Sequence, residues 1–195
     1  MVIGAILILI LILILMRWKE GYHDSEMSLT CMESTLNKKK YCIRERSNPQ
    51  LAVDLLAKTT EKMKTLASYV SETDPSNEIG KRFLHYFNPE NISETLSASE
   101  YTAYSENKGM NLAFCLNQKK DNNEELIDEN TLMFAAIHEM AHIATFSEGH
   151  TDEFWENFKY LLQKAVLLKL YTPVDYSKTN MDYCGLTLNT NPYFT

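Results

Sequence analysis

The first sixteen positions are almost all hydrophobic, whereas the rest of the chain mixes apolar and polar segments. As a helix, residues 1–16 would span roughly 24 Å at about 1.5 Å per residue, which approaches the membrane's hydrocarbon core of about 30 Å. Trp18 suits a membrane interface, and the positive-inside rule places Arg17 and Lys19 on the cytoplasmic side. We therefore predict a single-pass membrane protein anchored by residues 1–18, with its N-terminus outside and its folded domain cytoplasmic. A buried core helix or a strand is the alternative.

Residues 19–48 are polar, carry mixed charge and have no sustained hydrophobic period. This pattern predicts a linker between the anchor and a folded domain. The linker contains a basic cluster formed by Lys38-Lys39-Lys40, Arg44 and Arg46. The cluster would lie against anionic lipid, or it belongs to a solvated loop.

From Asn48 onward, the hydrophobic spacing predicts helices and one strand. Asn48 and Pro49 are typical of the start of a helix, and Asp74-Pro75 of its end. The segment 131–145 is apolar around its whole circumference, which predicts a buried helix capped by Asn130. The predicted elements are a helix over 49–74, a short helix over 82–87, a strand over 110–116, a helix over 131–145 and a helix that starts at Thr151.

Length and composition limit the class of protein. A chain of 195 residues corresponds to one domain with an appendage, and 45% hydrophobic residues with 11% aromatic residues indicate a globular protein. The formal net charge is −7, whereas nucleic-acid binders usually carry a basic surplus, so we expect no nucleic-acid partner. The cysteines include no Cys-x-x-Cys pair and are predicted to be reduced thiols: Cys31, Cys42, Cys115 and Cys184.

The buried helix carries an H-E-x-x-H motif, His138-Glu139-Met140-Ala141-His142. Histidines four residues apart lie on one face of a helix, so both imidazoles can bind the same Zn²⁺. A carboxylate at Glu139 can take a proton from a zinc-bound water, which then attacks a carbonyl. Three ionisable groups on a buried helix would be costly without a metal or partners. The motif therefore predicts zinc held by His138 and His142, with Glu139 as the catalytic base.

A catalytic zinc usually has three protein ligands and one open position. His150 is the candidate for the third ligand, because Gly149 can supply the backbone freedom that turns the chain back toward the metal. Two alternatives remain. Glu148 or Asp152 would serve as the ligand instead, or His150 would be a capping or surface residue of the next helix.

Together with His150 and the pair Phe154-Trp155, the motif resembles the signature of the SprT-like and WLM group of small zinc metallopeptidases. The resemblance implies an α+β zincin-like fold, zinc bound by His138, His142 and His150, and Glu139 as the base. Many members place the third histidine six residues after the second, whereas here the gap is eight residues. Members are common in large DNA viruses, so a virion or viral-factory membrane would suit an anchored form.

The same resemblance suggests further parts of a cleft. The strand over 110–116 resembles the edge strand on which zincins hold an extended substrate by β-augmentation, although a core strand would have the same pattern. Tyr183, or Tyr176, would donate a hydrogen bond to the oxyanion. Phe154 and Trp155 are expected to pack the last helix against the motif helix.

We therefore predict a membrane-anchored, zinc-dependent metallopeptidase with an α+β domain over residues 49–195 and a protein or peptide substrate. The alternative is a non-catalytic structural or interaction protein of a membrane or virion that keeps zinc for stability. A third hypothesis, a DNA-associated crosslink protease, would require DNA binding through residues 38–46.

Overall fold

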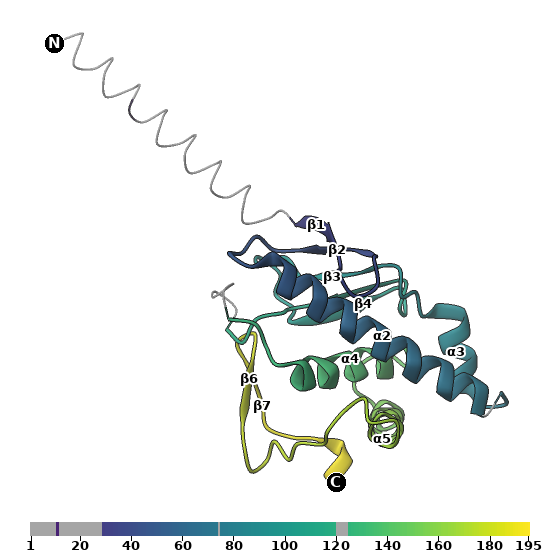
Figure 1. Ribbon diagram of the computed structural model, residues 1–195. Helices are drawn as coiled ribbons and strands as arrows, with labels where there is room; N and C mark the ends of the chain where they lie inside the picture. Colours follow the sequence, from purple (N-terminus) through teal and green to yellow (C-terminus); the bar gives the residue numbers. More distant parts are fainter. Residues whose placement is uncertain (1–10, 12–28, 74, 120–124) are drawn as a thin grey trace.

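The computed structural model describes Leu11 and residues 29–73, 75–119 and 125–195 (Figure 1). Within these ranges, no helix combines the length and the apolar character that crossing a bilayer requires. This finding corrects the predicted localisation, because a single-pass membrane protein with a cytoplasmic domain is not supported. The predicted anchor, residues 1–18, lies outside the described residues except for Leu11.

The described residues form an α+β fold, as predicted, with four helices and three small sheets. The helices are α2 (Pro49–Thr73), α3 (Glu78–Tyr86), α4 (Glu129–Ala144) and α5 (Asp152–Leu167), and a 3-10 turn η1 follows at Pro192–Phe194. The strands are β1 (Thr30–Glu33), β2 (Lys40–Ile43), β3 (Ile92–Glu94), β4 (Ala103–Glu106), β5 (Asn111–Phe114), β6 (Met181–Tyr183) and β7 (Leu186–Leu188).

The central sheet has three strands in the order β3-β5-β4. β3 runs parallel to β5 and β4 runs antiparallel to it, so β5 is the middle strand and β4 is an edge strand. Helices α2 and α4 pack on strands of this sheet and on each other, and α5 packs against α4 (Figure 1). The strand predicted over 110–116 therefore exists as β5, but it is not the edge strand.

The apolar face predicted for the long helix is buried in α2. Its side chains lie in the core between the sheet and α4, because a helix with one apolar stripe must cover that stripe. The buried residues that the spacing predicted are Ala52, Leu56, Met63, Leu66, Ala67 and Val70.

Strands β1 and β2 form a hairpin that packs on α2, so residues 30–43 belong to the folded domain. The carboxylate of Asp54 on α2 accepts hydrogen bonds at 2.7 Å from the hydroxyl groups of both Ser34 and Thr35. These contacts correct the predicted linker over residues 30–43, whereas residues 19–28 lie outside the described residues. Strands β1 and β2 are short and polar, and their sequence has no hydrophobic period. They form because they pack against α2, which the local sequence pattern does not reveal.

The basic cluster predicted at the surface is partly buried. Glu94 on β3 accepts a hydrogen bond from the backbone N–H of Arg44 at 2.8 Å and from the guanidinium of Arg46 at 2.5 Å. All three side chains are at most 4% exposed. The two arginines therefore join the segment after β2 to β3, because buried charges need partners of opposite sign. They are not placed to bind lipid or DNA.

The four cysteines form two disulfides, so the prediction of reduced thiols is wrong. Cys31 and Cys42 face each other in the β1–β2 hairpin, and Cys115 is bonded to Cys184 across 69 residues of chain. Long-range partners of this kind cannot be paired from spacing alone. Disulfides are typical of oxidising environments, which does not fit the cytoplasmic placement expected from the sequence.

The second disulfide attaches the β6–β7 hairpin to the end of the central sheet. Cys115 directly follows β5, and Cys184 lies in the turn between β6 and β7. The backbone N–H of Cys184 also donates to the carbonyl of Gln118 at 2.8 Å. Figure 1 shows this hairpin in yellow-green beside α4. A segment late in the sequence is thereby held near the middle of the fold.

Candidate metal centre

Helix α4 carries the H-E-x-x-H motif through the middle of the domain. It begins one residue after Asp128, whose carboxylate accepts hydrogen bonds from the backbone N–H of Thr131 at 2.9 Å and its hydroxyl at 2.6 Å. Asn130, the predicted cap, instead exchanges two 2.8 Å hydrogen bonds with the backbone of Thr172. The helix therefore starts earlier than predicted, and its buried faces fix the direction of the motif side chains.

His138 and His142 project from adjacent turns of α4 toward the same space. Their ring centroids are 5.0 Å apart, and both side chains are half-buried. This placement follows from the helical repeat, which stacks positions four residues apart on one face. The structure thus brings together the two histidines that the motif singled out.

His150 reaches the same space from the loop between α4 and α5. Its ring centroid is 5.0 Å from that of His138 and 5.0 Å from that of His142. Gly149 has a φ of +78°, a conformation that L side chains rarely adopt, so the glycine supplies the backbone freedom that was expected before His150.

The loop is held by the start of α5. The Glu153 carboxylate accepts hydrogen bonds from the backbone N–H groups of Phe146 at 2.9 Å and Ser147 at 3.1 Å. The hydroxyl of Ser147 donates to the same carboxylate at 2.7 Å. These bonds lower the pKa of Glu153, the bond from Phe146 most of all. Glu153 therefore sets the path of the chain toward His150, a role that the sequence did not indicate.

The three imidazoles fit the size of a zinc site. Two nitrogens bound tetrahedrally at about 2.0–2.1 Å from one ion would lie about 3.3 Å apart. The Nε2 atoms of His138 and His150 are 3.1 Å apart, and one nitrogen from each of the three histidines lies within 4.8 Å of the others. In the part of the chain that the structure describes, Glu148 and Asp152 do not belong to this group.

Phe154 forms the floor beneath all three rings. Its centroid is 4.9 Å from that of His138, 4.4 Å from that of His142 and 4.7 Å from that of His150, and its side chain is fully buried. Trp155 lies 5.7 Å from the ring of His150 but is 41% exposed. Phe154 thus packs α5 against α4 as predicted, whereas Trp155 covers the outer side of the site.

Burial controls the protonation of the motif residues. Removal from water, with smaller contributions from the neighbouring histidines, lowers the pKa of His138 to about 3. Burial first, then the charges of His150 and Lys108, lower the pKa of His142 to about 4. Both rings are therefore neutral at neutral pH, which is the form that binds a metal. Burial also raises the pKa of Glu139 to about 8.

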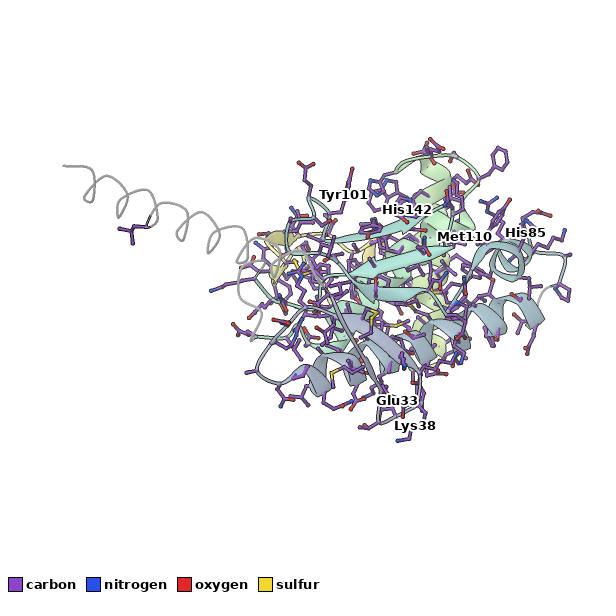
Figure 2. The ribbon with its side chains drawn as sticks, turned by 90° about the horizontal axis from the view of Figure 1, so that it is seen from above. Glu33, Lys38, His85, Tyr101, Met110 and His142 are labelled. Carbon is purple, nitrogen blue, oxygen red and sulfur yellow. A yellow bond between two sulfur atoms is a disulfide. The ribbon has the colours of Figure 1, made fainter. Side chains whose placement is uncertain are left out.

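A cleft of about 690 Å³ opens above the three histidines. Glu139, β4 and the loop carrying His150 line it together. In Figure 2, Tyr101 and His142 lie along one edge of the molecule, opposite Glu33 and Lys38 of the N-terminal hairpin. Because β4 is the exposed edge of the sheet, an extended chain entering the cleft would meet β4 rather than the strand predicted for this role.

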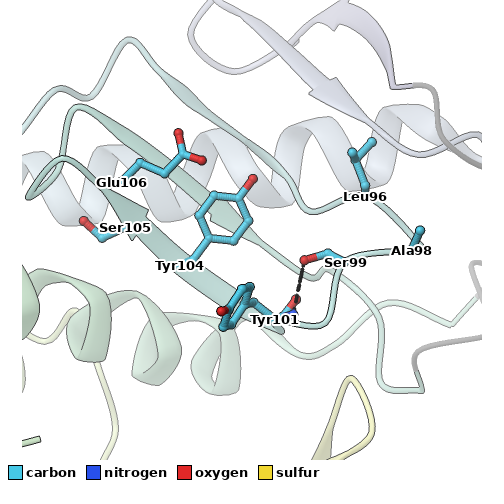
Figure 3. Close-up of a pocket in the computed structure, with 7 residues that line it drawn as sticks. All are labelled: Leu96, Ala98, Ser99, Tyr101, Tyr104, Ser105 and Glu106. Atoms are coloured by element: carbon cyan, nitrogen blue, oxygen red, sulfur yellow. Dashed lines mark hydrogen bonds between the residues drawn. The ribbon is translucent and has the colours of Figure 1, made fainter. Parts of the chain in front are cut away.

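A second hollow of about 610 Å³ adjoins this cleft along β4 (Figure 3). The two share Tyr101, Tyr104 and Ser105. The rings of Tyr101 and Tyr104 meet edge to face with centroids 6.3 Å apart. Aromatic side chains therefore line both hollows where they adjoin along β4.

The tyrosines considered as oxyanion donors are buried. The hydroxyl of Tyr183 donates to the backbone carbonyl of Cys115 at 2.9 Å, while Tyr183 lines a smaller cavity next to Glu139. Tyr176 is fully buried, with its ring centroid 5.0 Å from that of Phe134. The oxyanion role of Tyr183 stays a prediction.

The fold and the site define an α+β protein with a three-histidine candidate metal centre below a cleft. No protein-family model matches the chain. Similar sequences include the uncharacterized protein R325 of Acanthamoeba polyphaga mimivirus, 26% identical over 162 residues, which is 81% of each chain. Protein 136R of Invertebrate iridescent virus 6 is 40% identical over 57 residues, 29% of this chain and 32% of that protein.

A further relative, protein 042R of Invertebrate iridescent virus 3, is 41% identical over 59 residues, 30% of this chain and 36% of that protein. These viral relatives support the viral origin that the resemblance suggested. Among solved structures, the crystal structure of Wss1 from Saccharomyces cerevisiae is 15% identical with a TM-score of 0.49. The matched region covers 64% of this chain and 84% of the Wss1 chain. The function proposed below rests on the residues of the site itself.

Proposed function

We propose that this protein is a zinc-dependent metallopeptidase that hydrolyses peptide bonds in a protein or peptide substrate. One observation carries the proposal: three imidazoles converge beside a buried glutamate below a cleft bordered by an edge strand. Each part has a function in peptide hydrolysis, whereas a site that served stability alone would need neither the cleft nor Glu139.

His138, His142 and His150 would hold the zinc ion. Three protein ligands are typical of catalytic zinc, while structural zinc usually has four. Zinc, when bound, acts as a Lewis acid and lowers the pKa of water. Phe154 beneath the rings fixes their orientation, so little rearrangement is needed for binding.

Glu139 would move the proton. Its carboxylate lines the cleft next to His138, within reach of a molecule bound there. Burial alone favours the protonated form of Glu139, and a cation bound by the histidines would favour the ionised form. The ionised carboxylate would act as general base and accept a proton from the attacking water, and as general acid it would then donate that proton to the leaving amine. Its surroundings exclude most water, since the side chain is 5% exposed.

Strand β4 would hold the substrate. Its outer edge is unpaired in the central sheet, and it lies along the cleft between the histidines and the second hollow. A peptide could add to this edge by backbone hydrogen bonds, with its side chains pointing alternately to either face.

The variant Glu139→Gln tests the proposal. General acid–base groups typically contribute about 100- to 10,000-fold to a rate, so this change should lower peptidase activity on an unstructured protein such as casein at least 100-fold. Zinc content should stay at that of the wild type, because Glu139 is not in the ligand group. Wild-type protein that holds stoichiometric zinc but cleaves no substrate would favour the alternative, a zinc-stabilised structural protein.

A further inference from the structure

A cavity of about 150 Å³ lies beside Glu139 and adjoins the main cleft. His138 and Glu139 line both spaces, so the cavity opens next to the bond that would be cleaved. Phe134 and Ala135 of α4 form one wall, and the β6–β7 hairpin forms the other with Leu186 and Leu188. Apart from the site residues, its walls are thus mainly apolar.

We propose that this cavity is the specificity pocket of the enzyme and that it selects substrates with a medium-sized apolar residue directly after the cleaved bond. This inference rests on the function proposed above and names the substrate class for that site. An apolar cavity of about 150 Å³ can hold a molecule the size of benzene. Leucine, methionine and phenylalanine match that size, and an acidic side chain beside Glu139 would lose its hydration without gaining a partner of opposite sign.

The direction of β4 decides which substrate residue enters the pocket. β4 runs from Ala103, which lines both the pocket and the main cleft, toward Asn107 and Lys108, which line the main cleft but not the pocket. Antiparallel pairing is slightly more stable per residue than parallel pairing, and a peptide added antiparallel to β4 has its carboxyl-terminal part beside Ala103. The side chain that enters the pocket is therefore the one on the carboxyl side of the cleaved bond.

The hairpin wall is attached rigidly enough to discriminate by size. The Cys115–Cys184 disulfide joins it to the end of β5, and the Tyr183 hydroxyl donates to the Cys115 carbonyl at 2.9 Å. Tyr183 itself is 2% exposed. Leu186 is 53% exposed and lies where the hairpin meets solvent, whereas Leu188 packs partly against the core. Leu188 is therefore the residue to vary.

The test measures binding as well as cleavage. Peptide hydroxamates, which chelate zinc, would carry leucine, phenylalanine, alanine or aspartate as the first residue after the chelating group. Titration calorimetry of the zinc-loaded protein should show the leucine compound binding at least about 10-fold more tightly than the alanine compound, because three further carbon atoms are buried. The aspartate compound should bind more weakly still. Matched peptide substrates should show the same order in kcat/KM.

Leu188→Phe should fill the pocket and remove the preference for leucine, while the affinity for the alanine compound stays within about twofold. Leu188→Ala provides a second variant that enlarges the pocket and should shift the preference toward phenylalanine. Leu84→Phe is the matched control, because Leu84 is 77% exposed on α3.

Equal affinity of the wild type for the leucine and alanine compounds would overturn the inference but not the proposed function. If no hydroxamate binds the zinc-loaded protein, both fail.

Discussion

The two halves of the candidate metal centre are held in different ways. His138 and His142 project from α4, a helix buried along most of its length between α2, α5 and the sheet. His150 lies on an exposed loop whose path depends on one glycine and on the Glu153 carboxylate. The helix thus fixes two ligands as part of the core, whereas the third depends on a few local contacts. Substitutions should therefore affect the two halves to different degrees.

Loss of a helix ligand should have the largest effect. His138→Ala should abolish stoichiometric zinc binding and lower peptidase activity on the order of 1000-fold, because the metal supplies several kcal/mol of transition-state stabilisation. Zinc measured by mass spectrometry after dialysis, together with cleavage of casein, checks both effects. His85→Ala, at an exposed position on α3, is the control and should change neither. Full zinc occupancy in His138→Ala would show that the helix half is not essential.

Removing the support of the loop should have an intermediate effect. Glu153→Ala deletes the acceptor of three hydrogen bonds from Phe146 and Ser147 while leaving all three histidines in place. Loss of a contact that supports a metal ligand typically weakens metal affinity about 10- to 100-fold, and we expect a change in that range. Competition with a zinc chelator measures it. Asp152→Ala, in the same first turn of α5, should leave the affinity near that of the wild type. Equal effects of the two changes would argue against a specific role for Glu153.

Replacing the glycine before His150 should have the smallest effect. An added Cβ at Gly149 would meet no other atom within 4 Å, so the cost of Gly149→Ala comes from the backbone conformation alone. That cost is about 1 kcal/mol, which corresponds to about fivefold weaker zinc affinity. Gly149→Asn should recover much of the loss, because asparagine adopts positive φ more readily than alanine. A larger loss for asparagine than for alanine would contradict this explanation.

The helix half of the site could be predicted from the sequence because its information is local. A buried helix and a four-residue spacing are enough to place His138 and His142 on one face. Gly149 indicated that the chain could turn back and bring His150 to the metal, but the sequence left Glu148 and Asp152 open as alternative ligands. The contribution of Glu153 could not, since it depends on a side chain reaching back across a turn to backbone groups.

The strands were the least predictable part of the fold. β4 and the strands of the two hairpins are three or four residues long, and the β6–β7 hairpin is held by a disulfide to Cys115, 69 residues earlier in the chain. The burial of Arg44 and Arg46 depends in the same way on Glu94. Short strands reflect their packing surroundings more than their own composition, which explains why a polar segment was interpreted as a linker.

The bond between Cys115 and Cys184 also has a consequence for how the protein matures. A nascent chain would carry the complete H-E-x-x-H helix well before residue 184 left the ribosome, yet the wall beside Glu139 would still be missing. Selective cleavage would therefore begin only after translation has passed this cysteine and an oxidant has joined the two sulfurs. Until then, the newly made polypeptide would be a zinc-binding precursor without defined sequence preference.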